Sequence, residues 1–147
     1  MINWLKSLFE KPNNGSVGAD PLAQLEEYEQ KRERMDEVAQ VDGGHYTDSV
    51  ERVKQLKREG RHEEAIEILL KTVEATEKES EAHGGGWGVA PWYYEQLAII
   101  YRNEGRIEDE IKILERYGEQ EKAVGAGPVK LSERLKKARA LLNKRKT

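Results

Sequence analysis

KREGRHEEAIEILLK (residues 57–71) and RNEGRIEDEIKILER (residues 102–116) are two stretches of this chain that read almost alike. Seven of the fifteen aligned positions are identical, and Gly60–Arg61 of the first stretch matches Gly105–Arg106 of the second. In both stretches the Gly–Arg pair separates two segments whose apolar residues recur at helical spacing. The sequence therefore predicts a helix–turn–helix unit that occurs twice.

The segments around the two turns extend this pattern. Val50, Val53 and Leu56 precede the first turn, and Ile66, Leu69 and Val73 follow it. The second helix of the first copy is expected to continue to about Ala82, and Pro91 opens the first helix of the second copy. Between them lies HGGGWG, residues 83–88, which predicts an interhelical loop around Trp87.

The second copy resembles a tetratricopeptide repeat. The residues that carry the resemblance are Tyr94, Leu97, Ala98, Tyr101, Gly105, Ile111 and Leu114, in the family's aromatic, leucine, small residue and tyrosine spacing with its turn glycine. The first copy keeps Gly60, Ala65 and Leu69. The resemblance covers roughly residues 46–142 and implies stacked helix pairs that bind another protein.

Several positions depart from the family pattern. Arg52 and Val53 stand where leucine and a small residue are expected, and Glu110 replaces a small residue that lets paired helices approach. No proline follows either repeat, and the turn glycines, Gly60 and Gly105, are 45 residues apart, against about 34 in the family. A long second helix and the glycine loop account for the difference in spacing.

The expected fold is all-α: a short, right-handed, tetratricopeptide-like stack of antiparallel helix pairs with capping helices at both ends. Residues 1–20 are expected to form a short amphipathic helix and a flexible linker, and residues 21–147 a single helical domain. Within that domain we expect a charged N-terminal helix (21–42), two helix pairs (44–128) and a capping helix with a basic tail (129–147), the helix itself covering about 131–143. No segment shows the alternation of a β-strand. Two repeats are few for a stable array, so the flanking helices or a second copy of the chain must cover its ends.

Composition excludes several classes of protein. Charged residues make up 36% of the 147 residues, and 25 Lys and Arg against 28 Asp and Glu give a net charge of −3. The chain as a whole therefore lacks the excess positive charge that is typical of a nucleic-acid-binding protein. Cysteine is absent, which removes disulfides and thiolate chemistry. The sequence has neither a secretory signal nor an apolar run of about 18 residues, so a cytoplasmic location is expected.

No motif indicates catalysis. The HGGGW sequence at residues 83–87 is similar to a lipase oxyanion motif, but the required Gly-x-Ser-x-Gly elbow is missing. His45, His62 and His83 are the only histidines, and none has the spacing of a helical metal site. We therefore expect no enzyme activity, no catalytic residues, no metal and no cofactor. Trp87 is expected to fold back over the apolar helix faces or to contact a partner.

The resemblance to tetratricopeptide repeats also implies a binding groove, because the first helix of each pair lines the concave face in that family. The groove residues carried over by spacing are Thr47, Lys54, Lys57, Arg58, Trp92, Glu95, Ile99, Arg102 and Asn103. Their charge suits an acidic segment with one apolar anchor. Val50 and Glu95 occupy two positions of the Lys/Asn clamp that some members use on chaperone tails, which argues against that role.

Two alternatives stay open for the ends of the chain. Residues 129–147 hold eight Lys and Arg against Glu133 alone, a charge of +7 that could contact nucleic acid or an anionic membrane, or that only suits the helix dipole. Trp4, Leu5, Leu8 and Phe9 form an apolar face that either docks on the chain's own core or anchors a partner or membrane. We expect a non-enzymatic adaptor or regulator that binds another protein, with a basic-tailed nucleic-acid- or membrane-associated accessory protein as the alternative.

Overall fold

The computed structural model describes residues 20–146, and helices dominate it. In chain order the elements are α2 (Pro21–Val38), β1 (Gln40–Val41), β2 (Gly44–His45), the 3₁₀ helix η1 (Tyr46–Ser49), α3 (Val50–Arg58), α4 (His62–His83), α5 (Pro91–Asn103), α6 (Ile107–Gly118) and α7 (Gly127–Lys146). The chain is therefore of the all-α class. Among the described residues, no helix is both long and apolar enough to cross a membrane.

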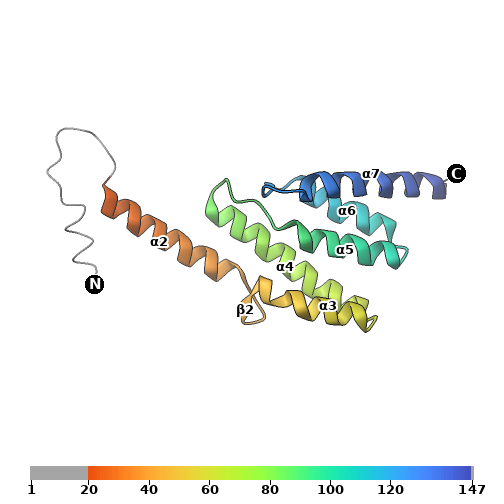
Figure 1. Ribbon diagram of the computed structural model, residues 1–147, viewed down its shortest axis with the longest axis horizontal. Coiled ribbons are helices and arrows are strands. Elements are labelled where there is room, and N and C mark those ends of the chain that lie inside the picture. Colours follow the sequence, from red (N-terminus) through yellow and green to blue (C-terminus); the bar gives the residue numbers. More distant parts are fainter. Residues whose placement is uncertain (1–19, 147) are drawn as a thin grey trace.

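The helices from α3 to α7 lie side by side in sequence order (Figure 1). Each packs against the next, and α7 also contacts α5. α2 projects to one side of this stack and rests on α4. α4 reaches as far as the sequence predicts, to His83, and its C-terminal half gives α2 a surface to pack on.

The two turns of the sequence repeat have the same backbone geometry. Gly60 and Gly105 adopt φ values of +70° and +73°, in the left-handed region that favours glycine. Arg61 N donates to Leu56 O at 2.9 Å, and Arg106 N donates to Tyr101 O at 2.7 Å. These are the hydrogen bonds of a Schellman motif, so both first helices end in the same way. The repeated sequence thus produces a repeated local structure.

The N-terminal helix begins as predicted but ends earlier. Asp20 caps α2 by accepting a hydrogen bond from Leu22 N at 3.1 Å, and Pro21 occupies the first turn. The helix ends at Val38, and residues 40–45 form an antiparallel hairpin. The expectation that the chain has no strand was therefore wrong at this point. Asp42 and Gly43 both have positive φ, as a two-residue hairpin loop requires.

The core runs through the helix stack. Leu97, Ala98 and Tyr94 of α5 are fully buried, and Leu69 of α4 and Leu114 of α6 join them in one cluster. Glu77 on α4 links three helices, because it accepts hydrogen bonds from Tyr94 at 2.8 Å and from both Nε and Nη2 of Arg116 at 2.7 Å. Helix α7 begins at Gly127, four residues before the predicted start, and buries Leu131 and Ala138 against the stack.

Candidate functional site

Helices α5 and α7 form a cationic face with two adjacent hollows. The first has a volume of about 220 Å³, and the second about 350 Å³. The residues of the first hollow are Glu95, Arg102, Lys130, Leu131, Glu133, Arg134 and Lys137. The described residues that line the second are Arg102, Lys137, Ala140, Leu141 and Lys144, and none of these five is acidic. The second hollow therefore combines three cations with an aliphatic floor.

A buried ion cluster fixes Arg102 at the junction of the two hollows. Glu110 on α6 has no exposed surface. Its carboxylate accepts a hydrogen bond from Nε of Arg102 at 2.9 Å and lies 2.8 Å from Nη2 of the same residue. Arg134 of α7 approaches the same carboxylate at 3.1 Å. Burial lowers the pKa of the Arg134 guanidinium, which still carries its charge at neutral pH. Two arginines against one glutamate leave one positive charge here.

The structure divides the nine groove residues predicted from the family resemblance. Glu95 and Arg102 line the α5–α7 hollows, where Glu95 pairs with Lys130 at 2.8 Å. Lys57 instead donates a hydrogen bond to Gln96, and burial lowers its pKa. Lys54 pairs with Glu51 at 3.5 Å, and Arg58 donates to Gln55 at 2.7 Å, so each is held by a neighbour on α3.

The remaining predicted residues lie apart from those hollows. Trp92 and Ile99 are half-buried, and the ring of Trp92 meets Tyr93 edge-on at 5.2 Å between ring centroids. Asn103 is exposed near the end of α5. Thr47 lines a different cavity, described below. Only part of the predicted set is therefore brought together at one place.

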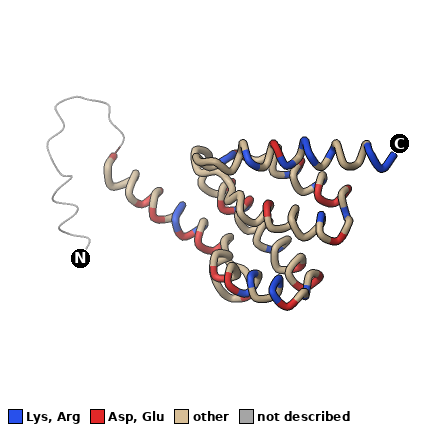
Figure 2. Tube along the Cα trace, turned by 45° about the vertical axis from the view of Figure 1, so that its right-hand side comes forward, with Lys and Arg blue, Asp and Glu red and all other residues tan. Residues whose placement is uncertain are grey.

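The basic C-terminal segment contributes to the same face. Figure 2 shows Lys and Arg recurring along α7. Lys137 and Lys144 share the second hollow with Arg102, although they follow it in the sequence by 35 and 42 residues. In the sequence, the predicted groove and the basic tail are separate segments and alternative binding surfaces. In the folded chain their side chains line one surface.

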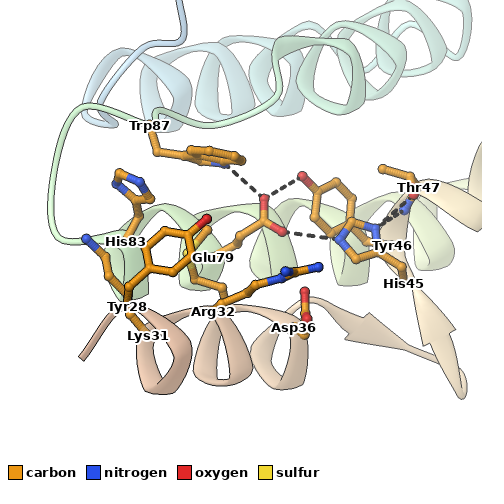
Figure 3. Close-up of a pocket in the computed structure, with 11 residues that line it drawn as sticks. Tyr28, Lys31, Arg32, Asp36, His45, Tyr46, Thr47, Glu79, His83 and Trp87 are labelled. Atoms are coloured by element: carbon orange, nitrogen blue, oxygen red, sulfur yellow. Dashed lines mark hydrogen bonds and ion pairs between the residues drawn. The ribbon is translucent and has the colours of Figure 1, made fainter. Parts of the chain in front are cut away.

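A second site, larger and more aromatic, lies between α2, α4 and the glycine loop (Figure 3). Its volume is about 530 Å³, within the range of small-molecule pockets. The lining residues are Tyr28, Lys31, Arg32, Met35, Asp36, His45, Tyr46, Thr47, Glu79, His83 and Trp87. Sequence reasoning missed this cavity, because its residues come from four separate segments with no shared motif.

Glu79 on α4 organises this cavity. It is only 6% exposed, and three side chains donate to its carboxylate or lie within hydrogen-bonding distance of it. Tyr46 donates to Oε1 at 2.9 Å, Nε1 of Trp87 donates to the same oxygen at 3.2 Å, and Nε2 of His45 is 3.2 Å from Oε2. Desolvation, more than the nearby Glu79 charge, raises the pKa of Tyr46 to about 12.

The hydrogen bonds of His45 indicate which of its two ring nitrogens carries the proton. Nδ1 of His45 accepts a hydrogen bond from Thr47 N at 3.3 Å and lies 2.8 Å from the Thr47 hydroxyl. A neutral imidazole has one donor nitrogen and one acceptor nitrogen. With Nδ1 as acceptor, Nε2 carries the proton that faces Glu79. Tyr46, Trp87 and His45 then each direct a hydrogen at the Glu79 carboxylate.

Trp87 is held in place but not buried. Half of its surface is exposed, its indole N–H bonds to Glu79, and its ring lies 4.9 Å from the ring of His83. The expectation that Trp87 folds back over the apolar helix faces was therefore wrong. Its loop is tightly placed, since a Cβ on Gly88 would come within 2.2 Å of Ala123 N. The other four anchor candidates, Trp4, Leu5, Leu8 and Phe9, lie outside the described residues.

Neither site contains a cluster of metal ligands. In residues 20–146, no group of three or more His, Cys, Asp or Glu side chains could hold a metal ion. Comparison of the chain with family models, curated proteins and solved structures found no match.

Proposed function

We propose that this chain is a non-enzymatic binding protein that recognises an acidic segment of another protein on the α5–α7 face. The observation that carries the proposal is the hollow formed by Arg102, Lys137, Lys144, Ala140 and Leu141. Three cations around two aliphatic side chains complement a segment with carboxylates and one aliphatic residue. The repeated helix–turn–helix geometry supports the same proposal, because helical repeats commonly bind peptides on an extended face.

The energetics of this face favour an anionic partner. Arg102 is already fixed by Glu110, so an incoming carboxylate need not restrict a mobile side chain to meet it. Arg134 adds a second guanidinium beside the same carboxylate, which keeps the local charge positive. Leu141 is 39% exposed and offers apolar area in the same hollow as the three cations. The positive charges would select an acidic partner, and the affinity would come from these charges together with apolar contact to Leu141.

Fluorescence anisotropy with labelled synthetic peptides tests this proposal. The test peptide carries Asp and Glu around one leucine, and its control replaces each acid with the corresponding amide. We expect the acidic peptide to bind and the amide peptide to bind at least about tenfold more weakly, a difference of 1.4 kcal/mol. Lys137→Glu should weaken the acidic peptide by a similar factor, because the charge reversal repels it.

A matched variant separates local from global charge. Lys136 is exposed on the same helix but lines neither hollow. Lys136→Glu changes the net charge by the same amount as Lys137→Glu, so it should leave peptide affinity within about twofold if the hollow is the site. Arg102 is not suitable for charge reversal, because its loss would deprive the buried Glu110 of one of its two arginine partners and would place a second carboxylate beside it.

The alternative of nucleic-acid or membrane binding has distinct outcomes in the same assay. The affinity for a phosphate-bearing partner falls steeply as the salt concentration rises. The affinity for the acidic peptide should fall less, because part of it comes from apolar contact with Leu141. If a DNA duplex or vesicles containing anionic lipid bind more tightly than the acidic peptide, and both lysine reversals weaken that binding equally, the peptide proposal is wrong.

A further inference from the structure

The cavity around Glu79 supports a second binding site, distinct from the α5–α7 face. Its walls carry exposed aromatic surface, a fixed buried carboxylate and two cations from α2. We propose that this cavity binds a small, flat aromatic molecule that bears a carboxylate or phosphate group. The ring would stack on Trp87, and the anionic group would meet Lys31 and Arg32.

The aromatic part of the proposal rests on Trp87. An exposed indole normally samples several rotamers, but here Nε1 donates to a carboxylate that is itself fixed by Tyr46 and His45. One region of the ring packs on His83, and half of the residue stays accessible. An aromatic face held in this way binds flat ligands at a low cost in conformational entropy.

The opposite wall is provided by α2. Figure 3 places Trp87 on one side of Glu79, and Tyr28 and Arg32 of α2 on the other. Tyr28 is 62% exposed, so much of its side chain is open to a ligand. A ligand between these walls would cover both aromatic side chains. The cavity volume of about 530 Å³ is sufficient for a two-ring molecule with its charged group.

The charge of the ligand follows from the groups that the fold leaves unpaired. Four charged residues line the cavity: Lys31, Arg32, Asp36 and Glu79. Glu79 already has its three side-chain partners. Within residues 20–146, no ion pair involves Lys31, Arg32 or Asp36. The four charges sum to zero, but the Glu79 carboxylate already has three partners. The charged groups left without a partner are therefore two cations and one carboxylate, which favours an anion over an organic cation.

NMR titration of the full chain tests the proposal with a matched set of probes. The indole N–H signal of Trp87, assigned by its loss in Trp87→Phe, reports on the cavity. The probes are 2-naphthoate and 2-naphthyl phosphate as aromatic anions, 2-naphthylmethanol as a neutral ring, 2-naphthylmethylammonium as a cation and cyclohexanecarboxylate as a non-aromatic anion. We expect one or both aromatic anions to bind at least about tenfold more tightly than the other three probes. The ratio of the two anions identifies carboxylate or phosphate as the preferred group.

Variants of α2 and Trp87 connect the binding to the named residues. Arg32→Gln should weaken the aromatic anion by about fivefold or more, whereas Arg34→Gln, on the same helix but outside the cavity, should leave it unchanged. Trp87→Phe and Trp87→Leu both remove the hydrogen bond to Glu79, but only phenylalanine keeps a ring. Both variants lack the indole signal, so their affinities are measured from the signals of the probe itself, and the phenylalanine variant should bind more tightly than the leucine variant. Lys137→Glu should have no effect, which separates this site from the α5–α7 face.

Three results would overturn the proposal. The first is equal affinity for the neutral and anionic rings, and the second is tighter binding of the cation. The third is that the full chain binds no probe, while a chain without residues 1–19 binds every probe regardless of charge. That third outcome would assign the cavity to the chain's own N-terminal residues.

Discussion

At the scale of single residues, Glu110 explains a departure from the repeat pattern. The equivalent residue of the first copy is Ala65, and both follow the turn arginine by four positions. Ala65 lets α3 and α4 approach closely, while Glu110 is buried between Arg102 and Arg134. The arginine from α7 has no counterpart in the first copy. Arg102 of the same helix pair and Arg134 of a third helix together compensate the buried carboxylate.

Leu97 is a direct test of where the core lies. Its side chain, on α5, is fully buried in the main core cluster, which spans several helices. Leu97→Ala would leave a cavity and should reduce the free energy of unfolding by about 2–5 kcal/mol. Urea denaturation followed by circular dichroism measures the change, with Leu141→Ala as the exposed control. A loss below roughly half a kcal/mol would place the core elsewhere.

Tyr46 predicts how stability changes at alkaline pH. Burial raises the pKa of Tyr46 to about 12, whereas a tyrosine in the unfolded chain ionises near pH 10. The unfolded state therefore holds fewer protons between these values. The contribution of Tyr46 is fully present below pH 10 and is lost as the pH rises through 12, at up to about 1.4 kcal/mol per pH unit.

Tyr46→Phe should remove this part of the pH dependence. At neutral pH the variant should be less stable by about 1 kcal/mol, because Glu79 loses a hydrogen bond. Between pH 10 and 12 its free energy of unfolding should fall less steeply than that of the natural chain. Urea denaturation at several pH values measures both effects, and the exposed Tyr28→Phe serves as control. Parallel pH profiles for Tyr46→Phe and the natural chain would contradict the prediction.

At the scale of elements, the two Schellman turns should respond equally to mutation. Gly60 and Gly105 have nearly the same φ, and a Cβ at either would meet no close atom. Replacement by alanine should therefore lower the free energy of unfolding by about 1–2 kcal/mol at each position, because the backbone is strained and not because of a steric clash. Thermal and urea denaturation of Gly60→Ala and Gly105→Ala test this expectation.

Gly118 provides the matched control for the turn glycines. It lies in α6 without a positive φ, and a Cβ there would also meet open space. Gly118→Ala should therefore be neutral or stabilise the chain by about 0.4–1 kcal/mol. If all three variants lost the same stability, the backbone of the turns would not be the cause.

At the scale of the whole molecule, residues 1–19 should be separable from the fold. The described core runs from Ala39 to Ala138, and Asp20 supplies the cap of α2. Removing residues 1–19 should therefore leave the midpoint of thermal unfolding within about 4 °C, equivalent to less than roughly 1 kcal/mol. Calorimetry of the shortened chain, beside limited proteolysis of the full chain, tests this. Unfolding of the shortened chain would make the N-terminal segment part of the core.

Local signals in the sequence predicted most of the elements correctly. The Gly–Arg pairs mark both turns, Asp20–Pro21 marks the start of α2, and Pro91 marks the start of α5. The hairpin after α2 was missed although its Asp42–Gly43 turn is a known hairpin signal, because each strand has only two residues. The alternation of apolar and polar residues that marks a strand cannot be recognised over two residues.

The sequence by itself determined the all-α class, the helix–turn–helix repeat and the cationic character of the C-terminal helix. These depend on backbone preferences and on side-chain periodicity, which act over a few neighbouring residues. Only the tertiary structure decided that Lys137 shares a hollow with Arg102, that Arg134 approaches the buried carboxylate of Glu110, and that Glu79 joins Tyr46 to Trp87. Those contacts join residues 8 to 35 positions apart on different elements. Packing of the helices, rather than any local motif, brings them together.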